Sequence, residues 1–331
     1  MMTTSKHAFL NHLNGIIACI IVALAASFLS SSYGAPVMLF ALILGMGANF
    51  LYTTEGCEQG IDFCATQLLR FGVALLGAGI YLEDLQLLGW DVLLIIIGAL
   101  VATIVFSTLV CRILGLDRRL GLMSGGAVAI CGISAALTLS SVMPKDKDTE
   151  KFTTLTVVLI ATFGAMAMVA YPVLVAWLDL NATQAGIFLG GSIHDVSHVV
   201  GAGFALSEEV GYAAMTVKMV RVAMLIPVAW VFLWLFKREQ EVSGQPQQRF
   251  PIPAFLMAFV GMMLLTNFGL IPTELGELFK LISRGCFVLA IVALGIKTSF
   301  KSLIDIGFKP IILVLTESLF IGALVLAWIL L

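Results

Sequence analysis

Charged side chains are scarce in this sequence. Asp, Glu, Lys and Arg make up 11% of the 331 residues, whereas soluble domains carry about 25%. Hydrophobic residues make up 60%, which excludes an ordinary soluble protein and indicates a polytopic membrane protein. The length accommodates ten or eleven spans of about 20 residues with short loops. We therefore expect one integral membrane domain over residues 1–331.

Motifs of several other protein classes are missing. Neither GxxxxGKS nor GxxxxGKT occurs, which excludes a P-loop for ATP, and the net charge of −2 indicates no nucleic-acid partner. The six cysteines show no CxxC spacing and four lie in apolar runs, so they favour core positions over a disulfide or zinc framework. Cys57 and Cys64 could pair only in a loop that faces an oxidising side. We expect no enzyme activity, no metal and no cofactor.

Apolar runs of span length follow one another along the chain and predict an all-α helix bundle. Lys and Arg gather in the segments that share a side with the N-terminus, so the positive-inside rule places that terminus in the cytoplasm and the C-terminus outside. The first run is expected to remain as an uncleaved helix rather than to be a signal peptide. The expected spans are residues 15–31, 36–52, 63–81, 91–113, 121–143, 152–178, 184–206, 209–236, 253–270, 277–298 and 310–330.

Two internal echoes suggest repeats. Residues 36–90 resemble residues 253–308, and each copy holds an arginine followed by a small-residue apolar run. An odd number of spans offsets these copies, so they would be inverted in the membrane, which is typical of transporters. The second echo pairs residues 125–128 with residues 190–193, Gly-Gly-Ala-Val against Gly-Gly-Ser-Ile.

Glycine clusters interrupt two of the expected spans. Glycine costs about 1 kcal/mol in a helix interior, so such clusters indicate either broken helices or very close helix packing. A broken helix exposes N–H groups at its positive end, which suits an anion. The candidate break residues are Gly125, Gly126, Gly132, Gly190 and Gly191.

Ionisable residues lie inside the span at 184–206 and in the span after it. Each charge in hydrocarbon costs roughly 2.5–3.5 kcal/mol, so such residues usually handle ions, protons or substrate. His194 and His198 share a helix face with Asp195 beside it, and Lys218 and Arg221 share another face. Buried charges must pair. Candidate carboxylate partners for the two cations are Asp195 and Glu317, and a purely structural ion pair is the alternative.

The two histidines allow three interpretations: a proton- or substrate-handling pair, a structural hydrogen-bonded pair, and a metal site. The sequence HDxxH differs by one methylene from the HExxH zinc-protease signature. An intramembrane metalloprotease would need a third ligand, and Asp305 is the only candidate. That residue is expected in a loop rather than at mid-membrane.

Three motifs together give the sequence a family resemblance. Residues 190–203 (GGSIHDVSHVVGAG), 131–136 (CGISAA) and 217–222 (VKMVRV) resemble hallmarks of the YeiH-type inner-membrane family, described as sulfate exporters. The chain departs from that pattern at His198, where many of those proteins carry glutamine. The resemblance covers essentially the whole chain. It implies a bacterial inner-membrane carrier with inverted repeats and a sulfur oxyanion, sulfate or sulfite, as substrate.

The sequence thus predicts a secondary transporter, an exporter, for a small anion, coupled to H⁺ or Na⁺. A passive anion channel and the metalloprotease are the alternatives, and a homo-oligomer stays open. The expected partners are the anion, the coupling ion and the lipid bilayer. The expected substrate-binding residues are Ser134, Ser192, His194, Asp195, His198, Lys218 and Arg221.

Overall fold

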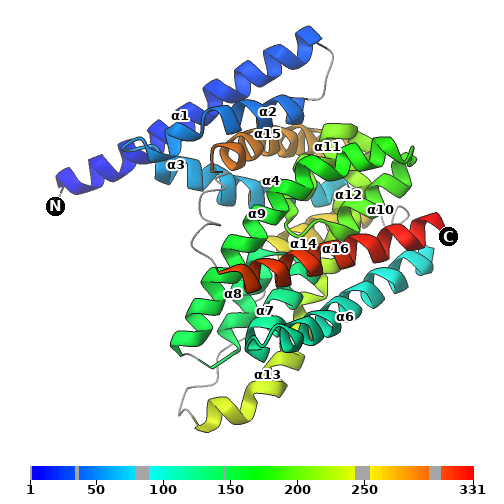
Figure 1. Cartoon of the computed structure of the whole chain (residues 1–331). Coiled ribbons are helices and arrows are strands. Elements are labelled where there is room, and N and C mark those ends of the chain that lie inside the picture. Colours follow the sequence, from blue (N-terminus) through cyan, green and yellow to red (C-terminus); the bar gives the residue numbers. More distant parts are fainter. Residues whose placement is uncertain (1, 34–36, 80–88, 145, 243–253, 298–306) are drawn as a thin grey trace. The chain divides into compact units, whose positions relative to one another are not determined.

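A computed structural model describes the chain except residues 1, 34–36, 80–88, 145, 243–253 and 298–306 (Figure 1). The described residues form helices and no strand, as expected for an all-α membrane protein. The helices are α1 (Met2–Tyr33), α2 (Val37–Gly47), α3 (Glu58–Phe63), α4 (Leu69–Leu76), α6 (Gly89–Ile113), α7 (Arg118–Ala129), α8 (Ile133–Ser141), α9 (Lys147–Trp177), α10 (Ala182–Ser192), α11 (Val196–Leu206), α12 (Glu208–Ala223), α13 (Leu225–Val242), α14 (Ala254–Asn267), α15 (Thr273–Lys297) and α16 (Phe308–Leu330).

Seven segments of the described chain are long and apolar enough to cross a membrane. Four of the eleven expected spans are not among these seven segments. The spans expected at 36–52 and 253–270 are the shorter helices α2 and α14, and those at 121–143 and 184–206 are each divided into two helices. The chain is therefore a multi-pass membrane protein, and both of its glycine-rich spans are interrupted.

The chain groups into two compact units whose segments alternate along the sequence. Unit 1 comprises residues 1–84, 204–208 and 253–299 and contains α1 to α4, α14 and α15. Unit 2 comprises residues 85–203, 209–252 and 300–331 and contains α6 to α10, α13, α16 and most of α11 and α12. Neither unit is a continuous stretch of chain, so each requires distant segments to assemble.

Unit 1 contains most of both copies of the longer sequence echo, residues 36–84 and 253–299. Helix α2 of the first copy packs on α15 of the second, and α14 of the second packs on α4 of the first. A Cβ on Gly295 would lie 2.7 Å from the Leu42 carbonyl oxygen, and one on Gly77 would lie 2.2 Å from the Phe259 carbonyl oxygen. The two copies therefore make reciprocal contacts through glycines, as a repeat pair related by a two-fold axis would. Their inversion in the membrane stays a prediction.

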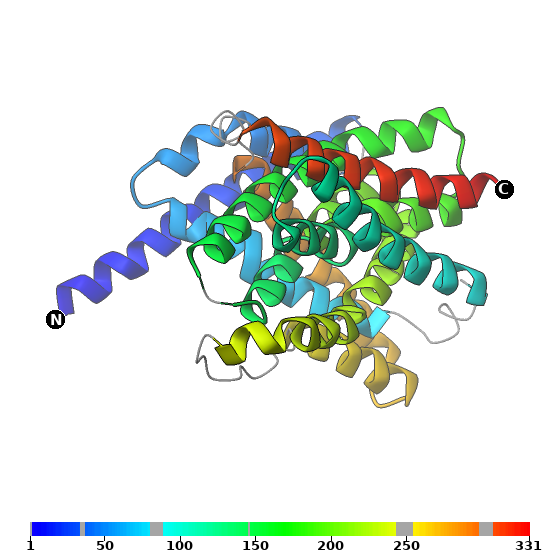
Figure 2. The ribbon, with the colours of Figure 1, turned by 60° about the horizontal axis from the view of Figure 1, so that its bottom comes forward.

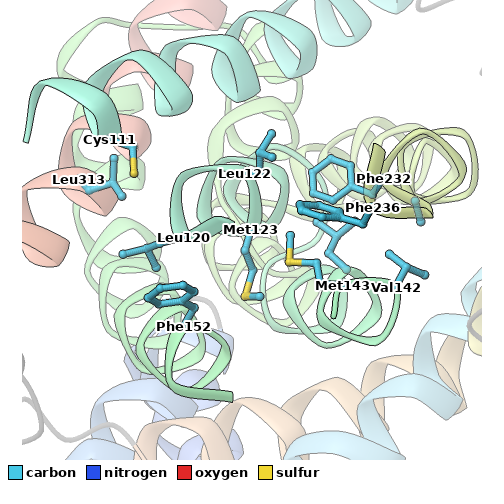
Figure 3. Close-up of a cluster of buried hydrophobic side chains, with 12 residues drawn as sticks. Cys111, Leu120, Leu122, Met123, Val142, Met143, Phe152, Phe232, Phe236 and Leu313 are labelled. Carbon is cyan, nitrogen blue, oxygen red and sulfur yellow. The ribbon is translucent and has the colours of Figure 1, made fainter. Parts of the chain in front are cut away.

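A hydrophobic cluster surrounds α7 in unit 2 (Figure 3). Met123 of α7, Leu139 of α8 and Leu313 of α16 are each fully buried in it. Aromatic side chains of α9 and α13, Phe152 and Phe232, complete the cluster. This packing holds α7, which ends at Ala129, against its neighbouring helices.

Helix α6 shows how unit 2 meets the bilayer. Leu94, Val101, Val105 and Leu109 are each more than half exposed and recur at helical spacing. An exposed apolar stripe on a helix of 25 residues suits contact with lipid chains. Trp90, at the start of the helix, is 81% exposed, as expected for an anchor at the membrane interface.

Candidate functional site

Two helices of unit 2 are broken, and the breaks define the candidate site. Helix α7 ends at Ala129 and α8 begins at Ile133, while α10 ends at Ser192 and α11 begins at Val196; both pairs can be followed in Figures 1 and 2. Gly132 adopts φ 65° and ψ −124° in the first break, a conformation that costs glycine little and other residues much. The second break comprises residues 193–195, with Ile193 extended at φ −65° and ψ 140°.

Only one of the five glycines predicted to break a helix lies at a break, namely Gly132. The prediction was wrong for Gly125 and Gly126, which are inside α7, and for Gly190 and Gly191, which are inside α10. These four allow neighbouring helices to approach closely. A Cβ would lie 2.5 Å from the Ser107 Cβ at Gly125 and 2.3 Å from the Ala214 carbonyl oxygen at Gly190.

Lys218 and Arg221 of α12 lie between the two breaks, and their side chains are 0% and 1% exposed. The Lys218 ammonium donates to three carbonyl oxygens, those of Ile130 at 2.9 Å, Ile193 at 2.8 Å and His194 at 2.5 Å. An ammonium has three protons, so every donor of Lys218 is engaged by the backbone of the breaks.

The Arg221 guanidinium forms four hydrogen bonds to the same two helix ends. Its Nε donates to the Ala129 carbonyl at 2.9 Å and its Nη2 to the Val128 carbonyl at 2.7 Å. Its Nη1 donates to Gly190 and Ile193, each at 3.0 Å. The last carbonyls of a helix have no partner within it and carry the negative end of its dipole. The two cations therefore satisfy and neutralise the C-terminal ends of α7 and α10.

This arrangement differs from the carboxylate pairing considered for the two cations. In the described part of the chain, no salt bridge joins Lys218 or Arg221 to Asp195 or Glu317. Backbone carbonyls take the place of the carboxylates, because two helices end beside α12. A sequence does not show that such ends converge.

Asp195 connects the two breaks. Its Oδ1 accepts the backbone N–H of Ser197 at 3.0 Å and the Ser197 hydroxyl at 2.5 Å, which caps the start of α11. A Cβ on Gly132 would lie 3.2 Å from Oδ2 of Asp195, so the carboxylate lies against the first break. Asp195 and Ser134, in the first turn of α8, are half-buried, unlike the two cations. The N-terminal ends of α8 and α11 thus converge on one carboxylate.

The two predicted histidines point to different neighbours. His194 is fully buried, and its Nε2 lies 2.7 Å from the Ser318 Oγ of α16. Ser318 donates its own proton to the Val314 carbonyl at 2.6 Å, so Nε2 of His194 is the donor of this bond. The Nδ1 atoms of His194 and His198 are buried without a hydrogen-bond partner. His198 instead packs on α9, where a Cβ on Gly164 would lie 2.6 Å from its Nδ1.

The remaining predicted residues have simpler surroundings. Ser192 is fully buried and donates to the Phe188 carbonyl of its own helix at 2.5 Å. Asp305, the third ligand considered for a metal, lies outside the described residues. Among the described residues, no group of three or more His, Cys, Asp or Glu side chains is arranged to hold a metal ion. The pair His194 and His198 therefore has no described third ligand.

A buried polar cluster on α16 was not included in the predicted site. Glu317 is fully buried, and its Oε1 lies within hydrogen-bond distance of the hydroxyl groups of Ser107 on α6 and, at 2.7 Å, of Ser124 on α7. The signal for it in the sequence is a lone carboxylate in the middle of an apolar helix of 23 residues. Its partners are 193 and 210 residues away in the chain, so spacing could not have identified them.

Comparisons with known proteins agree with the membrane architecture. A family model described as "Conserved hypothetical protein 698" matches residues 14–314. A UPF0324 membrane protein of Chlorobaculum tepidum is 42% identical over 97% of this chain and 90% of its own length. One from Rhizobium meliloti is 40% identical over 95% of this chain and 91% of its own. The UPF0324 membrane protein TauZ of Paracoccus denitrificans is 39% identical over 94% and 93%.

The chain belongs to this family of membrane proteins, which confirms the resemblance indicated by its three motifs. No solved structure matches the chain.

Proposed function

We propose that this chain is a secondary transporter that carries a small anion across the bacterial inner membrane. The observation that supports the proposal best is the pair of broken helices held together by two buried cations. Irregular backbone at membrane depth is tolerated where it is buried in protein or lines a polar cavity. Discontinuous helices of this kind form the substrate and ion sites of many transporters.

The anion site of this proposal lies at the start of α8 and α11. Each helix N-terminus carries roughly half a positive charge together with N–H groups that have no partner within the helix. The N-cap residue of α8 is Gly132, which has no side chain to cap the helix, and Ser134 in the first turn is half-buried. Lys218 and Arg221 neutralise the opposite, negative ends of the broken pairs, which leaves the positive ends of α8 and α11 to attract an anion.

Asp195 supplies a reason for coupling to a cation. An ionised carboxylate beside the two helix N-termini repels an anion, and the repulsion is strong away from water. A proton or a sodium ion on Asp195 removes this repulsion, so the cation favours binding of the anion. His194, whose Nδ1 is unpartnered, is a second group that could accept a proton there. The site thus supports transport coupled to H⁺ or Na⁺.

The substrate class and the direction of transport rest on the family resemblance. It favours a sulfur oxyanion, sulfate or sulfite, moved outward. The Lys and Arg bias favours a cytoplasmic N-terminus and an external C-terminus.

Transport of radiolabelled sulfate by the purified protein in proteoliposomes tests the proposal. We expect unlabelled sulfate inside the vesicles to accelerate uptake, because a carrier exchanges substrate, and we expect a proton or sodium gradient to change the rate. Asp195→Asn should abolish the response to the cation gradient, whereas the exposed Asp148→Asn on α9 should retain it. Uptake without exchange would indicate a channel. No uptake of sulfate or sulfite would overturn the proposal.

A further inference from the structure

Glu317 forms a closed cluster in unit 2 that the anion site does not use. Its carboxyl group is fully buried near the middle of α16. Oε1 contacts the hydroxyl groups of Ser107 and Ser124, and Oε2 is buried without a hydrogen-bond partner. The Gly121 carbonyl completes the cluster, because the Ser107 hydroxyl lies 2.6 Å from it.

The number of protons in this cluster indicates the state of the carboxyl group. Three close oxygen–oxygen contacts are present: Ser107 with Gly121, Ser107 with Glu317, and Ser124 with Glu317. Each contact needs one proton, and the two serine hydroxyls supply one each. An ionised Glu317 leaves two protons for three contacts, so one of the two contacts of Ser107 would hold none. Only the carboxyl group can supply the third proton. The neutral acid therefore satisfies the cluster, and the carboxylate does not.

No counter-charge accompanies Glu317 in the described part of the chain. Lys218 is committed to three backbone carbonyls, and no described salt bridge includes Glu317. The helices packed against α16 are α6, α7, α9 and α10, of which α10 has no titratable side chain. His194 contacts α16 through its hydrogen bond to Ser318. Cys111 is the residue of α6 whose thiol interacts electrostatically with Glu317. The other titratable residues of these helices are Asp91, Arg112, Arg118, Arg119, Lys147, Asp148, Glu150, Lys151 and Tyr171, with Lys309 on α16 itself.

The spacing of the oxygens argues for a proton rather than a metal cation. Ligand oxygens lie about 2.0–2.6 Å from the magnesium or calcium ion that they surround, and their mutual distances are correspondingly larger. Here the oxygens touch each other at hydrogen-bond distances of 2.6 and 2.7 Å. A metal ion would have to push α6, α7 and α16 apart, whereas a proton fits between the oxygens as they stand.

We infer that Glu317 is a proton-binding site of the transport cycle, separate from the anion site at α8 and α11. This inference rests on the proposed function for its role in transport. The carboxylate takes up one proton from water to become the neutral acid, and it returns that proton to water in another state of the cycle. Ser318, the next residue, receives the hydrogen bond of His194 in the second break. A movement of α16 on loss of the proton would therefore reach the anion site directly.

Infrared difference spectroscopy tests the proton without requiring transport. The wild-type protein should show the C=O stretching band of a neutral carboxylic acid at neutral pH, and Glu317→Gln should lack that band. Glu150→Gln, at an exposed position of α9, is the matched control and should keep it. Ser124→Ala keeps the carboxyl group but removes one donor to its ionised form, so the band should persist to higher pH. A wild-type spectrum that Glu317→Gln leaves unchanged overturns the inference.

Sulfate uptake in proteoliposomes tests the role in coupling. If wild-type uptake responds to a proton gradient, Glu317→Gln should abolish that response and Glu150→Gln should retain it. If Glu317→Gln keeps the full response, or if sodium alone drives uptake, the coupling role of Glu317 is overturned while the anion site stands. If no variant transports sulfate but the infrared band depends on Glu317, the proposed function fails and the proton site stands.

Discussion

Removing the charge of Lys218 should destabilise the protein far more than removing an exposed lysine. Lys218→Met keeps most of the length of the side chain but leaves the carbonyls of Ile130, Ile193 and His194 without their donor. Taking one partner out of a buried charged interaction costs about 3–5 kcal/mol, because each abandoned buried acceptor retains its desolvation penalty of about 1–3 kcal/mol. A loss of this size would loosen both helix breaks at once.

The assay is thermal unfolding of the purified protein in detergent, followed by tryptophan fluorescence. At about 2 °C per kcal/mol for a chain of this size, Lys218→Met should lower the apparent Tm by about 6–10 °C. Lys151→Met, at an exposed position of α9, is the matched control and should change it by about 1 °C or less. An apparent Tm of Lys218→Met within about 1 °C of the wild type would refute the reasoning, because surface changes have effects of that size.

Gly190→Ala should lower the apparent Tm, because its Cβ would lie 2.3 Å from the Ala214 carbonyl oxygen and overpacking costs about 1–3 kcal/mol. Gly98→Ala on α6 is the control and should not lower the apparent Tm, because the added Cβ would meet no atom within 4 Å. Desolvation would raise the pKa of Asp146, but hydrogen bonds from a backbone N–H of α9 and from the Arg119 guanidinium outweigh it and lower the pKa. The stabilisation is therefore present above the unfolded-state pKa and lost as pH falls through the folded-state pKa, so unfolding curves of the wild type and Asp146→Asn should differ at neutral pH and converge in acid. Elemental analysis should find no stoichiometric zinc in the purified protein, and zinc at one ion per chain would support the HDxxH metalloprotease instead.

Hydropathy predicted the helices well because a lipid-exposed helix must be apolar along its whole length. The span expected at 91–113 is α6, and the one at 310–330 is α16, each within about two residues. The positions of the two breaks were harder to predict. A glycine pair is compatible both with a break and with close packing, and the neighbouring helix decides between them. At Gly125 that neighbour is Ser107, which no local pattern in the sequence reveals.

The partners of the buried charges were also beyond the sequence. Side-chain chemistry favours carboxylates as partners of Lys218 and Arg221, yet their partners are main-chain carbonyls that every residue carries. These carbonyls became available because α7 and α10 end beside α12. The helix ends therefore had to be placed before the role of the cations could be inferred. Glu317 is a similar case, since its hydroxyl partners come from two distant helices.

The most direct test of the proposed anion site is cysteine labelling at Ser134, in the first turn of α8. All six native cysteines are buried, so the wild type should react slowly with a membrane-impermeant thiol reagent. Ser134→Cys in inside-out and right-side-out vesicles should react from at least one side, and sulfate should slow the reaction in a saturable way. Ser140→Cys, near the other end of α8, is the control and should react at a rate that sulfate does not change. Labelling of Ser134→Cys that sulfate and sulfite leave unchanged would contradict the placement of the anion at the broken helices.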